Sequence, residues 1–169
     1  MINNLNYLDT LSKSRNSQEM LRGAFLQTDK LYKKELKYLK IDNYEYDPDT
    51  AIEELGLDLE LINQLLEDYV RQIINAKIIF QKLIQELQDN KDNNLELDYT
   101  PLRDFAHKNL GVARNLRIED AEKILFRMMK DDDLKYMPKY LDALIASAII
   151  LKPECAYNTL SVMKIKDSF

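Results

Sequence analysis

The stretch LELINQLLEDYVRQIINAKIIFQKLIQELQ, Leu59 to Gln88, decides the fold class of this chain. Its apolar residues recur at alternating spacings of four and three, which is the period of one face of an α-helix. The seam comprises Ile62, Leu66, Tyr69, Ile73, Ala76, Phe80, Leu83 and Leu87. Because this seam continues for about eight helical turns, it predicts a helix from about 59 to 88 that packs against other helices.

Upstream of this seam the sequence predicts two more helices. Residues 1–16 show no clear period and are expected to be irregular, whereas apolar spacing predicts a helix from about 18 to 40. The segment TAIE, which begins at Thr50, has the form of a capping box and predicts the start of a short helix. Gly56 is suited to end that helix in the left-handed conformation, and Asp58 can cap the helix that follows.

Downstream of the seam the same signals recur. Thr100 and the proline after it predict the start of a helix that runs to about residue 116, with the hydroxyl as the cap. A further helix begins near Glu119 and ends in an acidic turn. Another spans about 134–151, with Pro138 in its first turn, and Pro153 can open a last short helix. Since no β-hairpin signature is present, we expect an all-α antiparallel bundle.

Length and composition place this bundle in one main domain. The 169 residues are 46% hydrophobic and 31% charged, a balance typical of globular proteins, and three Gly and four Pro are too few for a many-stranded sheet. We expect residues 47–169 to form an antiparallel four-helix bundle domain with short accessory helices. Residues 1–46 are expected to form an N-terminal extension that contains one extra helix.

Charge and cysteine content argue against several classes of function. The net charge of −5 argues against a nucleic-acid partner. One histidine and the single Cys155 cannot build a zinc site from soft ligands, so we expect no metal and no cofactor. No apolar run has the length of a bilayer, and the first residues are polar. We therefore expect a cytoplasmic protein without membrane insertion.

The stretch FAHKNLGVARNLRI contains the only histidine of the chain, His107. On a helical wheel Phe105, Val112 and Leu116 all fall within about 40° of the side opposite to it. This apolar arc is the expected core stripe of the helix. His107 is therefore expected to point toward solvent.

The neighbours of His107 suggest a chemical role. Arg103, Leu110, Gly111 and Arg114 fall on the same side of the wheel, so we expect Leu110 to be exposed as well. A glycine within a helix costs about 1 kcal/mol relative to alanine, and a partner that approaches the imidazole closely would explain it. A neutral imidazole is a good nucleophile, and guanidinium groups can stabilise a transferring phosphoryl group. This combination favours a phosphoryl acceptor.

These residues resemble the bacterial histidine-containing phosphotransfer (HPt) family, whose pattern His-x-Leu-Lys-Gly lies on the second helix of a four-helix bundle. His107, Gly111, Ala113, Asn115 and Leu116 stand where that pattern and its continuation place them. The upstream segment IEELGLDLELINQLLEDYVRQI resembles the entry helix and first bundle helix of the family. The resemblance covers about residues 49–151.

The resemblance implies a multistep two-component phosphorelay. His107 would accept a phosphoryl group from a receiver aspartate and pass it to another, and Gly111 would leave clearance for the receiver. Lys108 and Leu110 would belong to the same docking surface. The implied partners are a response-regulator receiver domain or a hybrid histidine kinase. Such a domain has no kinase activity and no metal of its own, since the receiver supplies the Mg²⁺.

The sequence departs from the family pattern at two positions. Leu110 stands in place of the lysine that helps to hold the phosphoryl group, and Asn109 replaces a core leucine. Arg103 and Arg114 are candidates to supply the missing charge. An alternative is a degenerate bundle that docks a receiver or kinase without carrying phosphate. A helical scaffold outside signalling is the third possibility.

Overall fold

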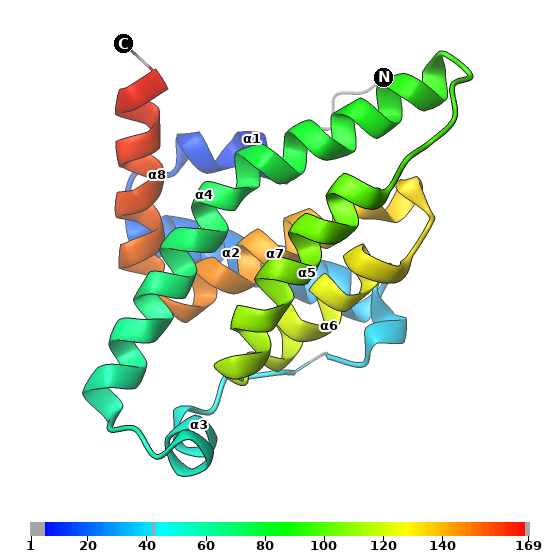
Figure 1. The fold of residues 1–169 in the computed structure, drawn as a ribbon. Coiled ribbons are helices and arrows are strands. Elements are labelled where there is room, and N and C mark those ends of the chain that lie inside the picture. Colours follow the sequence, from blue (N-terminus) through cyan, green and yellow to red (C-terminus); the bar gives the residue numbers. More distant parts are fainter. Residues whose placement is uncertain (1–5, 42, 168–169) are drawn as a thin grey trace.

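The computed structural model describes residues 6–41 and 43–167, and this part of the chain is helical, with no strand (Figure 1). The elements follow in the order α1 Tyr7–Thr10, η1 Leu11–Lys13, α2 Ser17–Lys33, η2 Lys37–Leu39, α3 Pro48–Leu55, α4 Leu59–Asp92, α5 Thr100–Asn115, α6 Glu119–Lys130, η3 Leu134–Tyr136, α7 Met137–Leu151 and α8 Pro153–Asp167, where η marks a 3₁₀-helix. The expected all-α class is confirmed over the described residues.

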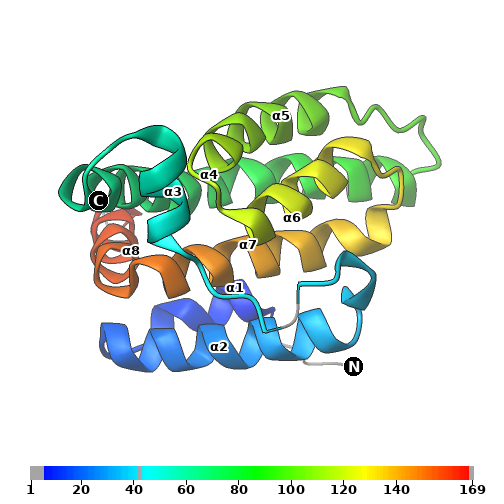
Figure 2. The ribbon, with the colours of Figure 1, turned by 90° about the horizontal axis from the view of Figure 1, so that it is seen from below.

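Helix α7 lies at the centre of the molecule. Figure 2 shows it between α2 on one side and α4 and α6 on the other, and it also contacts α8. Ten of its fifteen residues are buried, because its sequence MPKYLDALIASAIIL is apolar on nearly all sides. A helix that is hydrophobic all round must be covered by neighbours in every direction. The core of the protein is therefore organised around α7.

Helices α4, α5, α6 and α7 form successive neighbours. Each of them contacts the next one in the chain, and α7 also contacts α4. Figure 1 shows α4 and α5 running in opposite directions, and the short connections place each following helix beside its predecessor. Helix α3 packs on α4 at one end of this group. Helix α5, which carries His107, is held in this group by its contacts with α4 and α6.

The N-terminal helix α2 packs on α7 and α8. Its buried side carries Met20, Ala24 and Leu31. The hydroxyl of Tyr32 donates a hydrogen bond of 3.1 Å to the Asp120 carboxyl in the first turn of α6. Burial raises the pKa of Asp120. The N-terminal segment is thus tied to the rest of the protein by apolar contact and by a buried polar pair.

The seam of α4 is confirmed over most of its length. The expected seam residues from Ile62 to Phe80 are buried, and the helix continues past the expected end to Asp92. Near its C-terminal end Leu83 is only partly buried, whereas Ile84 is buried. The face of an α-helix drifts by about 20° with each seven-residue repeat. Leu83 lies three such repeats after Ile62, so it has turned partly away from the core, and Ile84 faces the core in its place.

Most helix ends follow local chemistry. Gly56 ends α3 with a φ of +67°, and the Asp58 carboxylate accepts a backbone hydrogen bond at the start of α4, as expected. Helix α3 starts at Pro48, two residues before the expected cap at Thr50. The cap is Asp47, which accepts hydrogen bonds from a backbone N–H at 3.0 Å and from the Thr50 hydroxyl at 2.8 Å.

Three further expectations for the helices differ from the structure. The helix expected at about 18–40 ends at Lys33, because the chain turns there and buries Leu36. Residues 6–16, expected to be irregular, contain α1 and η1, while residues 1–5 lie outside the described part. The last helix, expected to be short, runs to Asp167. Within residues 6–41 and 43–167, no helix has both the length and the apolar composition needed to cross a bilayer.

Candidate functional site

Helix α5 begins with a local polar cap. The Asp98 carboxylate accepts a hydrogen bond of 3.0 Å from the backbone N–H of Thr100. Hydrogen bonds from Thr100 also hold the pKa of Asp98 below its usual range. Thr100 is thus the first helical residue and not the cap, and Pro101 lies in the first turn, where its missing N–H costs no helical hydrogen bond.

The buried face of α5 lies about 60° around the helix from the expected stripe. His107 is exposed, as predicted, whereas Phe105 and Val112 are only partly buried. Leu116 at the C-terminal end is buried as expected. The fully buried residues are Leu102, Ala106, Asn109, Leu110 and Ala113. Ala106 and Ala113 allow a neighbouring helix to approach closely, and such small residues are weak markers of a core in a sequence.

Leu110 corrects one prediction. The wheel placed it on the exposed side beside His107, but its side chain is 1% exposed and belongs to the core. The reason is the rotated stripe, which covers the side of α5 where Leu110 lies. Leu110 therefore cannot be part of an exposed docking rim.

The imidazole of His107 meets a residue of the next helix. Its Nδ1 lies 3.2 Å from the sulfur of Met129, which is half-buried near the end of α6. This contact could not be predicted from the sequence, because Met129 lies 22 positions away and belongs to an apolar helix face like any core residue. The structure brings the two together because α5 packs on α6.

The two arginines expected to flank His107 are each paired with a carboxylate. Arg103 forms an ion pair with Asp132 and lies over the ring of Tyr99, with its Cζ 5.6 Å from the ring centroid. Arg114 pairs with Glu122 of α6 at 3.0 Å. Both guanidinium groups thus have an anionic partner on or just after α6.

Lys108 and Gly111 complete the exposed side of α5. Lys108 is exposed, and the part of the chain that the structure describes contains no ion-pair partner for it. Gly111 is also exposed, and a Cβ added there would meet no atom within 4 Å. The fold does not require a glycine at this position, so its cost to the helix is unexplained by packing.

Asn109, which stands in place of a core leucine of the family pattern, is buried, and both the oxygen and the nitrogen of its side-chain amide are hydrogen-bonded. Its oxygen accepts a hydrogen bond of 3.0 Å from the side-chain amide of Gln72 in α4. Its nitrogen donates to the carbonyl of Phe105, one turn earlier, at 2.9 Å. The amide therefore connects α4 to the helix that carries His107.

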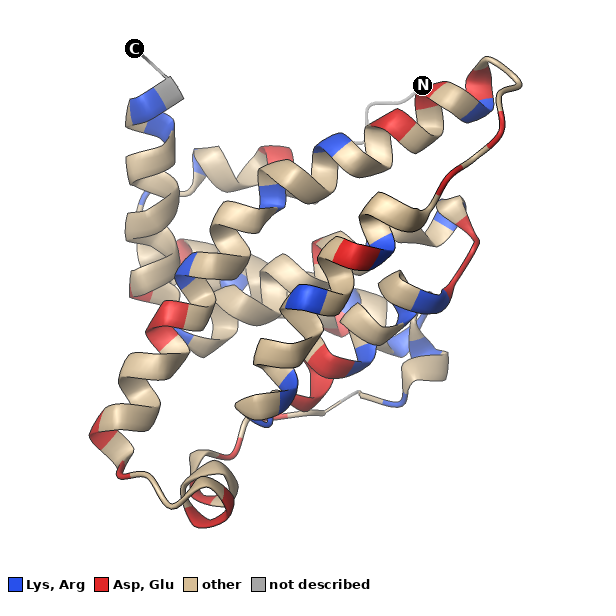
Figure 3. Ribbon diagram, viewed as in Figure 1, with Lys and Arg blue, Asp and Glu red and all other residues tan. Residues whose placement is uncertain are grey.

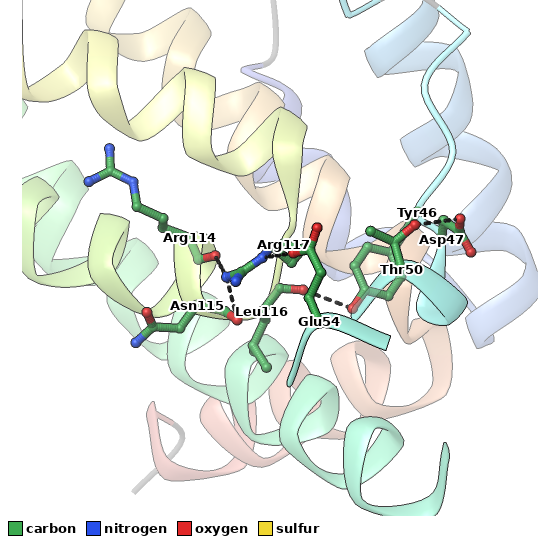
Figure 4. Close-up of polar contacts among 8 residues, drawn as sticks. All are labelled: Tyr46, Asp47, Thr50, Glu54, Arg114, Asn115, Leu116 and Arg117. Carbon is green, nitrogen blue, oxygen red and sulfur yellow. Dashed lines mark hydrogen bonds and ion pairs between the residues drawn. The ribbon is translucent and has the colours of Figure 1, made fainter. Parts of the chain in front are cut away.

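The C-terminal end of α5 is held by residues that precede α4 (Figure 4). The Tyr46 hydroxyl donates a hydrogen bond of 2.9 Å to the carbonyl of Leu116. Arg117 pairs with Glu54 of α3 and donates to the carbonyl of Arg114 at 2.9 Å. These bonds satisfy carbonyls that a helix end leaves free. Sequence reasoning missed this anchor, because its members are distant along the chain.

The surroundings of the site carry charges of both signs. Figure 3 shows Lys and Arg interspersed with Asp and Glu along α4, α5 and α6. The described residues contain no group of three or more His, Cys, Asp or Glu side chains placed to share a metal ion. The chemistry visible here is that of one exposed imidazole with open space beside it. The chain matches no protein-family model, no curated protein and no solved structure.

Proposed function

We propose that this protein is a phosphorelay intermediate of the HPt type, in which His107 carries a phosphoryl group between receiver aspartates. One observation carries the proposal: the single imidazole of the chain is exposed on α5, with open space at Gly111 one turn further along. A receiver can bring its phosphoaspartate into contact with a nucleophile only where no side chain obstructs the approach.

The arrangement of the helices supports the proposal. Helix α4 contacts α5, α5 contacts α6, α6 contacts α7 and α7 contacts α4, and this closed set of neighbours is compatible with an antiparallel four-helix bundle. In this interpretation α5 is its second helix, the place that the histidine has in the HPt family. Helix α3 then corresponds to the entry helix, and α2 and α8 are additions to the bundle.

The chemistry requires positive charge near the moving group. Lys108 is the exposed cation next to His107 in the sequence. Arg103 and Arg114 can contribute if they exchange their carboxylate partners for the phosphoryl oxygens. Exposed ion pairs are worth only about 0–1 kcal/mol, so a doubly charged phosphoryl group can compete for these side chains. The protein needs no metal of its own, because the receiver brings its Mg²⁺.

A second candidate function is docking without phosphate transfer, and one observation favours it. Leu110 stands at the position of the family lysine, and it is buried in the core. The protein therefore has no cation at the position where the family holds the phosphoryl group. A protein that still binds a receiver or kinase would then act by occupying it. This candidate predicts binding to a receiver and no phosphohistidine.

The test is phosphoryl uptake from phosphorylated receivers, with His107→Gln as the control. We expect label on the protein that is lost in acid and stable in alkali, and no label on the variant. Because His107 is the only histidine, no other imidazole can contribute to this signal. Receiver binding without any label on wild-type protein would favour the docking function. Absence of both would contradict each candidate.

A further inference from the structure

The imidazole of His107 has one hydrogen-bonding neighbour. Among residues 6–41 and 43–167, the only such contact of the ring is the 3.2 Å approach of its Nδ1 to the Met129 sulfur. The other ring nitrogen, Nε2, has no hydrogen-bonding partner in this described part of the chain. The side chain is exposed, so Nε2 is accessible to a partner in solution.

The chemistry of the thioether decides which nitrogen carries the proton. A methionine sulfur can accept a hydrogen bond weakly but cannot donate one. A contact between Nδ1 and this sulfur is therefore a hydrogen bond only if Nδ1 is protonated. A neutral imidazole has one N–H, so Nε2 then has a free lone pair.

We infer that Met129 is a positioning residue, which holds His107 in the Nδ1–H tautomer and directs Nε2 outward as the nucleophile. The part of this inference that concerns phosphate rests on the proposed function. The part that concerns the tautomer does not.

The fold keeps Met129 in place without any ligand. Its neighbours in α6, Leu125 and Met128, are fully buried, and α6 packs on both α5 and α7. Met129 itself is half-buried, and its sulfur reaches the edge of the α5–α6 contact. The orientation of the imidazole is thus a property of the free protein, prepared before a receiver arrives.

The transfer step balances with this tautomer. The Nε2 lone pair forms a bond to the phosphorus of the phosphoaspartate, and the bond from phosphorus to the aspartate oxygen breaks. The aspartate leaves as a carboxylate with the bonding electron pair. The ring retains its Nδ1 proton and gains one positive charge, while the phosphoryl group keeps its two negative charges. No base is needed to remove a proton from the attacking nitrogen.

The test reads the tautomer by nitrogen NMR at a pH where the imidazole is neutral. A chain with one histidine gives two ring-nitrogen signals that need no assignment to a residue. For the wild type we expect Nδ1 in the range of protonated nitrogens and Nε2 in the range of unprotonated nitrogens. In Met129→Leu, which keeps the volume and removes the acceptor, the two shifts should move toward each other or exchange their order.

Two further variants sharpen the result. Met128→Leu makes the same chemical change at the adjacent position and should leave the nitrogen shifts as in the wild type. Met129→Glu supplies a stronger acceptor and should restore the Nδ1–H pattern. If wild-type His107 already showed a protonated Nε2, or if Met129→Leu left the shifts unchanged, the role assigned to Met129 would be wrong.

Phosphoryl uptake from phosphoramidate, a small donor, connects this result to function. We expect the uptake rate of Met129→Leu to fall by the same factor as its Nδ1–H population. An unchanged rate together with a changed tautomer would show that Met129 does not position the nucleophile. If wild-type protein took up no phosphoryl group from phosphoramidate or from phosphorylated receivers, the proposed function would fail, whereas the NMR result would still decide the tautomer.

Discussion

The side-chain amide of Gln72 donates a hydrogen bond of 3.0 Å to the side-chain oxygen of Asn109, which is 1% exposed. This pair joins α4 to α5 two residues after the exposed His107. The two partners differ in their surroundings, because Gln72 is only partly buried and can reach water. Loss of one partner should therefore have a different effect from loss of the other.

Gln72→Leu should destabilise the protein by about 1–3 kcal/mol, since it leaves the buried Asn109 oxygen without a donor. Asn109→Leu should be neutral or stabilising, because it replaces a buried amide with apolar volume and Gln72 can turn to solvent. In the Asn109→Leu background the change at Gln72 should cost little. Urea denaturation of the two single variants and the double variant measures these terms. A loss of about 2 kcal/mol or more for Asn109→Leu alone would contradict this expectation.

Leu110→Ala should lower the free energy of unfolding by about 2–5 kcal/mol, the usual cost of removing a buried leucine side chain. The variant should still bind a receiver once folded, because Leu110 is not on the surface. Lys108→Ala, at an exposed position of the same helix, is the matched control and should change stability by about 0.5 kcal/mol or less. Thermal denaturation of both variants provides the comparison. Equal stability of the two would show that Leu110 is not a core residue.

Gly111→Gln should stabilise the free protein by up to about 1 kcal/mol, because glycine has a poor helix propensity and the new side chain meets open space. The same change should block phosphoryl transfer from a receiver, since it fills the clearance beside His107. Uptake from phosphoramidate should continue, because that donor is small. Transfer from a receiver at the wild-type rate would remove the argument for close approach at Gly111.

Arg103→Ala and Arg114→Ala should each slow phosphoryl transfer severalfold without unfolding the protein, because each removes positive charge near the acceptor. Arg22→Ala is the control, since Arg22 is an exposed arginine on α2. Transfer rates at low and high salt separate local charge from general attraction. Wild-type rates for both arginine variants would leave Lys108 as the cation to test next.

Asp142 should make stability depend on pH. Burial raises its pKa to about 7, with Asp9 and Glu35 adding to the rise and Lys30 opposing it. The pKa in the unfolded chain is about 3.9. Folding therefore favours the protonated carboxyl, so this contribution to stability is full below pH ~4 and is lost as the pH rises through ~7, by up to ~4 kcal/mol. The stability difference between wild type and Asp142→Asn, measured by urea denaturation across this range, should show the loss. A constant difference would contradict it.

Much of the fold could be predicted from the period of the apolar residues. The α4 seam is carried by large side chains such as Ile62 and Phe80, and these are buried as expected. Local caps were predicted where a single residue decides them, as at Gly56 and Asp58. The prediction of Thr50 as the cap of α3 is wrong, because Asp47 and Thr50 are both good capping residues. Pro48 favours Asp47 as the cap, since proline is suited to the first position of a helix.

The candidate site was harder to predict. The exposure of His107 and the burial of Asn109 follow from the wheel, but the burial of Leu110 does not. The wheel argument depends on the large apolar residues, whereas the buried face of α5 also includes the small residues Ala106 and Ala113. Contacts between helices, such as that of His107 with Met129, depend on how two helices are rotated against each other. The spacing of apolar residues within one helix does not determine this rotation.

The central position of α7 has a consequence for the newly made chain. Helix α2 buries one face against α7, yet roughly a hundred residues separate its end at Lys33 from the start of α7 at Met137. At a synthesis rate of 5–20 residues per second, the ribosome needs roughly 5–20 s to make that interval. During this time α2 lacks its contacts with α7 and α8, and its apolar side is a surface that chaperones can bind. The part of the core between α2 and α7 can form only after α7 has left the ribosome.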